Sequence, residues 1–335
     1  MNEERLSTIR CMSEPTSTTD DPSVPSLNQG RLLIALAAVL WSLSGGFSKV
    51  LTKDTPFALN DPKPAALAIA VFRLVFAGIV FVPALRRQDF SFRPIMLGMV
   101  LVFGLMNLFF VPAMVGGTAA DAILLQYTAP LWMLLASVVW LGEKADRRSL
   151  IAVIIGTVGI AVIVTGTILH SGWESGELGV LGLGLGSGIT YAGVVLFLRV
   201  LRGCSSRWLV VLNHLGGAAV VGIGWFVLAR VWHVDSTMPG TVAQYVTLAL
   251  FGAVQMGLPY WLMTRGLRSV SPQEAGTITL LEPILNPVWA YLVAGEMPLP
   301  ATFFGGVFIL WALAWRYWPV PRKDAHNPPE ATGGL

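Results

Sequence analysis

Arg73 and Glu282 are ionisable residues that lie deep within long apolar segments. A charge inside a membrane is costly, so each side chain must face a partner, a cavity or water, and such residues are functional candidates by default. Glu282 lies 11 residues after Ser271, which begins its segment. That distance is about 16 Å along a helix that rises ~1.5 Å per residue, so we expect Glu282 near the middle of the membrane.

Arg73 lies nine residues into its own segment, and Glu282 is the nearest opposite charge by depth. The pair has two possible roles, a structural staple or a gate in which the carboxylate exchanges a proton or a substrate cation with the guanidinium. Because a guanidinium keeps its charge and is a poor proton carrier, the sequence favours the staple.

Several polar residues share one helical face with Glu282, at spacings of three and four. They are Thr279, Asn286 and Trp289. We expect this face to form a wall of a substrate or ion pathway. Pro283 removes the backbone hydrogen bond to the Thr279 carbonyl, which favours a kink and leaves an acceptor for a ligand or water. The alternative is that Glu282 only satisfies neighbouring backbone groups.

A second set of polar and aromatic residues lies inside other apolar segments and is expected to line the same pathway. The set is Trp41, Asn107, Gln126, Tyr127, Tyr191, Gln255, Tyr260 and Trp261. Aromatic residues more often anchor at the membrane surface, so only part of this set is expected to touch substrate or water. Pro259 marks a hinge in its segment. For His214, packing with a hydrogen bond is favoured over a titrating role.

The segments that hold these residues contain an internal repeat. Six residues recur 153 positions later: Thr118, Asp121, Ala122, Pro130, Gly142 and Glu143 reappear as Ser271, Glu274, Ala275, Pro283, Gly295 and Glu296. In each copy a hydroxyl residue precedes a carboxylate by three positions, the spacing of a capping box at a helix start. Each copy then continues for about 22 mostly apolar residues, enough to cross a bilayer. Glu143 and Glu296 are expected at the membrane surface.

Ten apolar runs are long enough to be membrane spans, and all are expected to be helices. They cover residues 31–52, 64–85, 94–115, 118–142, 149–168, 178–200, 208–230, 241–264, 271–295 and 299–318. Five spans lie in each half, so the second half enters the membrane from the opposite side. The sequence therefore predicts an all-α integral membrane protein of ten transmembrane helices in two inverted five-helix repeats.

The loop charges predict the orientation. Of the 22 Lys and Arg residues, 17 fall on the side of the N-terminus, four on the other side, and Arg73 within a span. Because the positive side of a membrane protein faces the cytoplasm, both termini are expected there. The predicted domains are a disordered tail (1–30), a first repeat (31–168), a second repeat (178–318) and a short tail (319–335).

Composition excludes several classes of protein. The chain is 54% hydrophobic and 12% charged, which lies outside the range of soluble domains. Its two cysteines support neither a disulfide framework nor a metal cluster, and no metal or cofactor is expected. The glycines at 182, 184, 186 and 188 lie in an apolar span without the Lys-Ser/Thr of a phosphate loop, so they predict close helix packing. Neither nucleic-acid binding nor ATP-driven pumping is indicated.

The order and spacing of these motifs resemble the drug/metabolite transporter superfamily, in particular its ten-span EamA-type family. The motifs are Trp41 and Lys49 in span one, Phe72-Arg73 in span two, the stretch from Ala122 through Pro130 to Glu143, and Leu281-Glu282-Pro283 to Glu296. Span one reads Trp-Ser-Leu-Ser-Gly-Gly at 41–46 where many relatives have Trp-Gly, so no substrate role is assigned to that turn.

The resemblance implies a secondary transporter, most simply an exporter, of small organic metabolites or drugs across a bacterial inner membrane by alternating access. Coupling to protons and a homodimeric state are open. A non-transporting membrane sensor or assembly factor is the alternative. A membrane-embedded enzyme is less favoured, because the four histidines are scattered and no acid/base cluster is evident.

Overall fold

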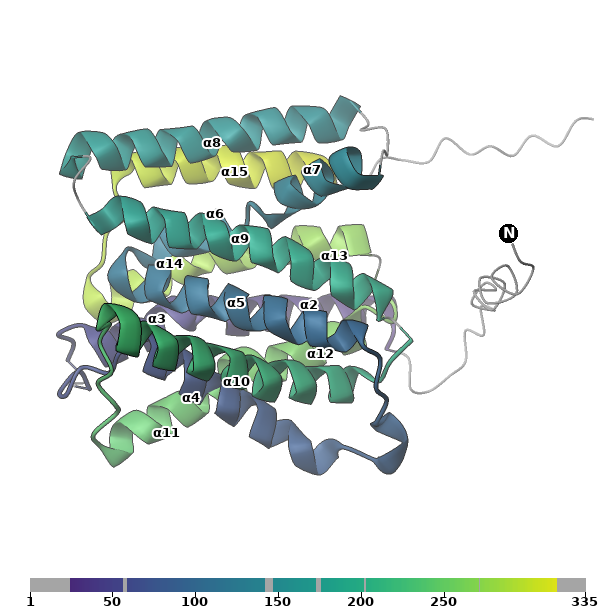
Figure 1. Ribbon diagram of the computed structural model, residues 1–335. Coiled ribbons are helices and arrows are strands. Elements are labelled where there is room, and N and C mark those ends of the chain that lie inside the picture. Colours follow the sequence, from purple (N-terminus) through teal and green to yellow (C-terminus); the bar gives the residue numbers. More distant parts are fainter. Residues whose placement is uncertain are drawn as a thin grey trace, which may run out of the picture.

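The computed structural model describes residues 25–56, 59–141, 147–172, 176–201, 203–270 and 272–317. Every regular element in these ranges is helical, and the long helices run nearly parallel or antiparallel to one another (Figure 1). Nine of the described helices are long and apolar enough to cross a membrane, and a shorter apolar helix covers Pro300–Arg316. The prediction of an all-helical membrane protein is confirmed.

The helices follow the ten predicted spans in chain order. They are α2 (Leu27–Ser42) with α3 (Ser44–Thr52), α4 (Ala66–Phe81), α5 (Ile95–Gly116), α6 (Ala119–Gln126) with α7 (Ala129–Leu141), α8 (Arg147–Ser171), α9 (Gly176–Val200), α10 (Ser206–Trp232), α11 (Val242–Leu250) with the π-helical η3 (Phe251–Gly257) and α12 (Leu258–Gly266), α13 (Pro272–Ile278) with α14 (Leu281–Ala294), and α15 (Pro300–Tyr317). Two short 3-10 turns, η1 (Val82–Ala84) and η2 (Arg87–Asp89), follow α4.

The helices of the two halves are interleaved. Span one, α2 and α3, packs against α12 and α14 of the second half. Two further helices of the first half also pack against the second half: α5 contacts α9 and α10, and α6 contacts α9. The outermost pair, α8 and α15, lies along one edge of the bundle (Figure 1). We call spans one, eight and nine the first helix group, and spans three, four, six and seven the second.

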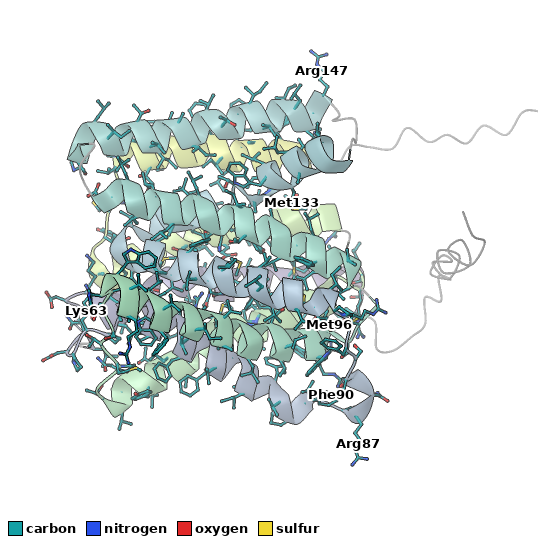
Figure 2. All side chains as sticks on the ribbon, in the orientation of Figure 1. Lys63, Arg87, Phe90, Met96, Met133 and Arg147 are labelled. Atoms are coloured by element: carbon teal, nitrogen blue, oxygen red, sulfur yellow. The ribbon has the colours of Figure 1, made fainter. Side chains whose placement is uncertain are left out.

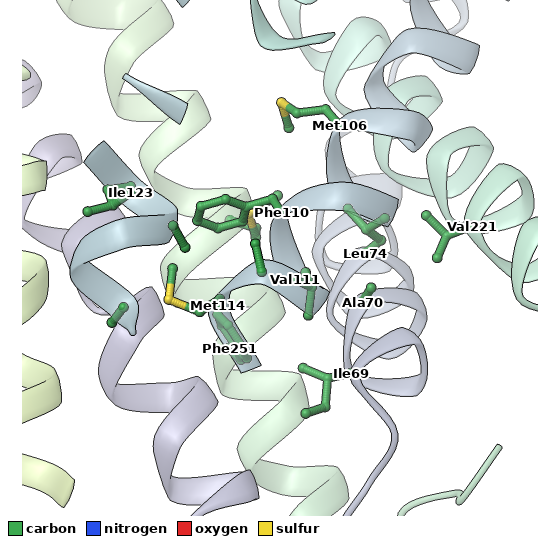
Figure 3. Packing of buried hydrophobic residues seen from close by; sticks show 14 of the residues in the cluster. Ile69, Ala70, Leu74, Met106, Phe110, Val111, Met114, Ile123, Val221 and Phe251 are labelled. Carbon is green, nitrogen blue, oxygen red and sulfur yellow. The ribbon is translucent and has the colours of Figure 1, made fainter. Parts of the chain in front are cut away.

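Apolar side chains fill the space between these groups. Figure 3 shows Phe110 of α5 beside Met114, with Phe251 below them and Leu74 on the neighbouring helix. All four side chains are buried. Close packing of this kind supplies helix association in a membrane, where lipid is as apolar as the core.

Glycines on α9 allow the predicted close approach only in part. A Cβ on Gly188 would lie 2.6 Å from the Leu125 carbonyl oxygen, and one on Gly184 would lie 3.0 Å from the Leu125 side chain. Gly182 has no atom within 4 Å of the equivalent point, so its predicted packing role is wrong. The contacting glycines meet two helices, because Gly184 and Gly188 face Leu125 of α6 and Gly186 faces Phe109 of α5.

Basic side chains gather at one end of the bundle. Arg87 and Arg147 lie at the same end, and Lys63 lies at the other (Figure 2). This separation agrees with the two sides predicted from the loop charges. The predicted tails lie largely outside the described residues.

Asp89 joins the two halves at the end that carries Arg87. One carboxylate oxygen accepts from the Ser205 hydroxyl at 2.7 Å and from Arg207 at 3.3 Å, and the other accepts from the Arg86 amide at 2.8 Å. These bonds, first that from Ser205, hold the pKa of Asp89 below its ordinary value. A depressed pKa means that the folded state gains stability above the unfolded-chain pKa, about 3.9, and loses it as the pH falls through the folded value.

Replacing Asp89 with Asn is therefore expected to reduce the acid sensitivity of folding. The thermal midpoint of purified protein in detergent should fall less between pH 6 and pH 3.5 in the variant than in the unmodified chain. Asp54, on the loop after α3, accepts a hydrogen bond from the Asn60 side chain within the same loop and gives the matched control Asp54→Asn. An equal fall in all three proteins would contradict the assignment.

Candidate functional site

A small cavity of about 40 Å³ lies between the two helix groups. Its walls are Trp41, Arg73, Met106, Phe110, Gln126, Tyr127, Tyr191, Gln255, Met256, Tyr260 and Glu282. A water molecule needs roughly 10–15 Å³ of such space, so about three waters fit. Sites for drug-sized ligands are typically about 300–1,000 Å³, so an organic molecule fits only after the walls separate.

The structure brings together eight of the 13 residues that the sequence singled out for the pathway. They are Trp41, Arg73, Gln126, Tyr127, Tyr191, Gln255, Tyr260 and Glu282. They come from six different spans, and both charged residues are among them. The other five do not line the cavity and are Asn107, Trp261, Thr279, Asn286 and Trp289.

Spans four and nine are both interrupted at the cavity. Span four breaks at Tyr127 and Thr128, between α6 and α7, and span nine breaks at Thr279 and Leu280, between α13 and α14. Tyr127 and Leu280 are 153 positions apart, which is the offset of the sequence repeat. The two breaks are therefore equivalent positions of the two halves, as expected for discontinuous helices around a transport site.

The two breaks contact each other through Glu282. The Tyr127 hydroxyl lies 2.7 Å from a carboxylate oxygen of Glu282 and 3.0 Å from the Thr279 carbonyl oxygen. Pro283 was predicted to leave this carbonyl oxygen without a backbone donor, but it also accepts from the Glu282 amide at 3.0 Å, so that prediction is wrong. Glu282 lies in the first turn of α14, where the helix dipole favours an acidic side chain.

Span eight is irregular beside the cavity. Its middle is the π-helical segment η3, and Gln255 and Met256 of this segment line the cavity. The side-chain nitrogen Nε2 of Gln255 donates to the backbone carbonyl oxygen of Trp41 at 3.0 Å. The side-chain oxygen Oε1 of Gln255 is buried without a hydrogen-bond partner. The sequence placed a hinge at Pro259, but the irregular turn lies just before it. Such π-helical turns are frequent at functional sites.

Arg73 is buried, with 2% of its surface exposed, and its partner is an amide. Its Nη2 donates to the Asn107 Oδ1 at 2.6 Å, and its guanidinium lies over the rings of Phe251 and Phe110 at 5.2 and 5.8 Å. The three ion pairs among the described residues do not include Arg73. The predicted pair with Glu282 is therefore wrong for this conformation, because Asn107, one helix away, reaches the guanidinium first.

Asn286 and Trp289 contact span one instead of the cavity. The Asn286 amide donates to the Ser44 hydroxyl at 2.7 Å, and the Trp289 indole donates to the Ser42 hydroxyl at 2.8 Å. These serines flank the break between α2 and α3. The prediction that the whole Glu282 face of span nine lines the pathway is wrong for the residues after Glu282. Span one packs against that part of the helix.

His214 is packed, as favoured from the sequence. It is fully buried, its Nδ1 lies 2.7 Å from the Val210 carbonyl oxygen, and its ring contacts those of Phe103 and Tyr260. The His214 ring therefore packs against Tyr260, which lines the cavity.

The capping pattern of the repeat is only partly as predicted. The Thr118 hydroxyl accepts from the Asp121 amide, as a cap should. The Asp121 carboxylate, however, accepts from the hydroxyls of Thr118 and Thr302 at 2.6 and 2.7 Å, and so joins α6 to α15. In the second copy Glu274 pairs with Arg31, and Ser271 lies outside the described residues.

A buried ion pair lies at the end of the bundle that holds the loop after span one. Lys49 is 0% exposed, and its Nζ donates to a Glu296 oxygen at 2.6 Å and to the carbonyl oxygens of Gly117 and Met114 at 2.8 and 3.0 Å. The other Glu296 oxygen accepts from the Ala119 amide at 2.6 Å. This Lys49 cluster links the first helix group to the second.

The sequence placed Lys49 in the last turn of span one and Glu296 at the end of span nine, and the helix bounds agree with both positions. It did not predict that the two charges pair. The last carbonyls of α5 and the first amides of α6 lack helical partners, so they attract a cation and an anion respectively. Neither attraction is visible until the ends of these helices are placed beside α3. Glu143, the repeat equivalent of Glu296, lies outside the described residues.

Comparisons with known proteins show which family the sequence matches. The model described as EamA-like transporter family matches residues 28–165 and 178–317. An uncharacterized transporter of Archaeoglobus fulgidus is 25% identical over 292 residues, which are 87% of this chain and 97% of that protein. The pseudopaline exporter CntI of Pseudomonas aeruginosa is 24% identical, over 85% of this chain and 94% of its own length.

Two further matches are of similar extent. The biotin transporter of Escherichia coli K12 is 24% identical over 306 residues, which are 87% of this chain and 95% of that protein. A crystal structure matches 87% of this chain and 98% of its own with a TM-score of 0.56 and 16% sequence identity, which shows likeness of fold alone.

Proposed function

The chain belongs to the EamA-like transporter family, and on that premise we propose that it is a secondary transporter that exports small organic molecules by alternating access. It is a multi-pass membrane transporter and not an enzyme. The observation that carries the proposal is the small cavity at the matched breaks of spans four and nine, which is lined by the opposite charges of Arg73 and Glu282.

The size of the cavity supports movement of the helix groups. With room for about three waters, the site admits an organic substrate only when the two groups separate at one end. At the end that holds the Lys49 cluster, separation must break the contacts of Lys49 and Glu296. Discontinuous helices at equivalent positions of two repeats suit such rocking around a central site.

The direction and location of transport belong to the proposal as well. One relative is named as an exporter of pseudopaline and another as a biotin transporter, so small metabolites are the substrates we propose. The excess of Lys and Arg at the end near Arg87 supports a cell-membrane protein with both termini in the cytoplasm. The carboxylate of Glu282 is the group that we propose to carry coupling protons.

The experiment is a trans-stimulation assay with purified protein in liposomes. Pools of labelled amino acids, nucleosides, sugars and cationic drugs are added outside, with the same pool, unlabelled, inside or absent. An alternating-access carrier reorients faster with substrate bound than when it is empty. The rate of uptake of at least one labelled pool should therefore saturate with concentration, and it should be higher when the same unlabelled pool is inside the liposomes. Uptake that neither saturates nor responds to internal substrate would indicate a channel. No uptake by folded protein would favour the non-transporting alternative.

A further inference from the structure

The loop between α4 and α5 carries basic side chains that the cavity does not use. Arg86, Arg87 and Arg93 are exposed in this loop, and the ion pairs found among the described residues do not include them. Figure 2 shows Arg87 at the edge of the bundle, at the end that also carries Arg147. The one acidic residue of the segment 82–94, Asp89, is buried and already bonded, so it leaves the three exposed guanidinium groups uncompensated.

Aromatic side chains lie between these arginines in the chain. Phe90 and Phe92 are 57% and 69% exposed. The Phe90 ring packs against that of Trp208 at the start of α10, with centroids 4.9 Å apart. Exposed aromatic and basic side chains in one short segment are typical of segments that lie in the membrane surface, with rings at the boundary of the acyl chains and charges among the headgroups.

The second half of the protein holds this loop in place. The Trp208 indole donates to the Ser91 carbonyl oxygen at 2.7 Å. Asp89 accepts from the Ser205 hydroxyl and from Arg207 at 2.7 and 3.3 Å. These bonds fix the middle of the loop, so the arginines are presented from an ordered segment. An ordered set of charges loses less conformational entropy on binding a ligand than a flexible tail does.

Exposed aliphatic side chains precede the loop on α4 and η1 and follow it on α5. They are Ile79, Val80, Val82, Ile95, Leu97 and Leu101. In a chain that spans a membrane, such side chains contact the lipid hydrocarbon. A short loop that joins two lipid-facing stretches lies at the level of the lipid headgroups, so the anions closest to its arginines are headgroup phosphates. This position favours lipid over a soluble acidic partner.

We propose that the 86–93 loop is a binding site for anionic phospholipid headgroups. In this site Arg86, Arg87 and Arg93 donate to phosphate oxygens, and the rings of Phe90 and Phe92 lie at the boundary with the acyl chains. A guanidinium suits this ligand because its planar fork of N–H groups forms paired, charge-assisted hydrogen bonds with phosphate. The inference goes beyond the proposed function, because it concerns a lipid bound at the surface and not the transported molecule.

The site should prefer lipids with a net negative charge. The phosphate is the only charge in the headgroup of phosphatidylglycerol, whereas the choline cation of phosphatidylcholine repels the arginines. Purified full-length protein in a neutral detergent is titrated with each of these two lipids, carrying identical acyl chains. Native mass spectrometry measures the apparent affinity, and the thermal midpoint measures stabilisation. We expect phosphatidylglycerol to bind more tightly and to raise the thermal midpoint further.

A triple variant, Arg86→Gln with Arg87→Gln and Arg93→Gln, assigns this preference to the loop. The affinity for phosphatidylglycerol should fall by about fivefold for each arginine removed, because each basic residue near an anionic membrane surface contributes about that factor. The affinity for phosphatidylcholine should change little. The corresponding triple change to Lys keeps the charges, so it should retain most of the preference and stands in if the Gln variant does not fold.

The matched control removes three exposed basic residues elsewhere, on the loop after span one and at the end of α10. It combines Lys53→Gln, Lys63→Gln and Arg230→Gln, and it should keep the preference for phosphatidylglycerol. An equal fall in this control would show that the lipid binds outside the 86–93 loop and would overturn the assignment.

Two further outcomes would also contradict the proposal. Equal affinity of the unmodified protein for the two lipids would show that the headgroup charge is not recognised. Equal stabilisation by glycerol 1-phosphate, which has the phosphate but no acyl chains, would indicate a site for a soluble anion and not for lipid. These measurements do not involve uptake, so their failure would leave the proposed transport intact.

Discussion

Glu282→Gln is expected to abolish accumulation driven by a proton gradient while leaving exchange of substrate across the membrane. Gln keeps the shape and an acceptor for the Tyr127 hydroxyl, now 2.7 Å from the carboxylate, but it cannot release a proton. With no proton exchanged for substrate, the gradient does no work, and the accumulation ratio should fall from well above one to about one. The measurement is labelled substrate in liposomes, with and without a pH difference.

Exchange must be measured at a saturating substrate concentration, so that a lower affinity of the variant does not reduce the measured rate. The matched control is Glu274→Gln, a carboxylate of the same span whose side chain is 29% exposed and pairs with Arg31 at the end of the bundle. It should retain accumulation. Equal loss of exchange and accumulation in folded Glu282→Gln would show that the residue serves binding or structure and not coupling.

Lys49→Met is expected to lower stability by about 3–5 kcal/mol, the usual cost of removing one partner from a buried ion pair. The variant leaves the Glu296 carboxylate with the Ala119 amide as its remaining recorded partner. It also deprives the carbonyl oxygens of Met114 and Gly117 of their shared donor. Reversible unfolding of the purified protein in mixed micelles, followed by circular dichroism, measures the change.

The double variant Lys49→Met with Glu296→Gln distinguishes a charge effect from lost packing. Without the unpaired carboxylate, it should recover a large part of the stability lost in Lys49→Met, which is a positive coupling energy in a double-mutant cycle. Arg31→Met is the matched control, because the Arg31–Glu274 pair is about half exposed at Arg31 and such pairs contribute little. Additive losses in the double variant would contradict a buried pair.

Much of the fold follows from local properties of the sequence. Apolar length predicts the spans, and the observed helices agree with them within a few residues. The repeat offset of 153 predicted matched halves, and the breaks at Tyr127 and Leu280 keep that offset. Pro283 predicted an interruption beside Glu282 because proline in the interior of a helix removes one backbone bond, and the structure begins a new helix at Leu281. These features depend on neighbours along the chain.

For the candidate site, the sequence predicted the residues better than it predicted their contacts. Eight of the 13 selected residues line the cavity, since a polar side chain deep in an apolar span needs polar surroundings and a central cavity provides them. Depth alone could not say which partner each would meet. Asn286 was expected to face the pathway but contacts Ser44, and Arg73 contacts Asn107 in place of Glu282.

The sequence by itself determined the class of protein, its ten apolar spans, the repeat and the residues that a membrane interior makes conspicuous. Only the tertiary structure decided which charges are paired. Lys49 and Glu296 are 247 positions apart and meet because α3 packs against α14 beside the ends of α5 and α6. Helix formation is driven by nearest neighbours, whereas the pairing of charges depends on which helix ends lie together, and that is a property of packing.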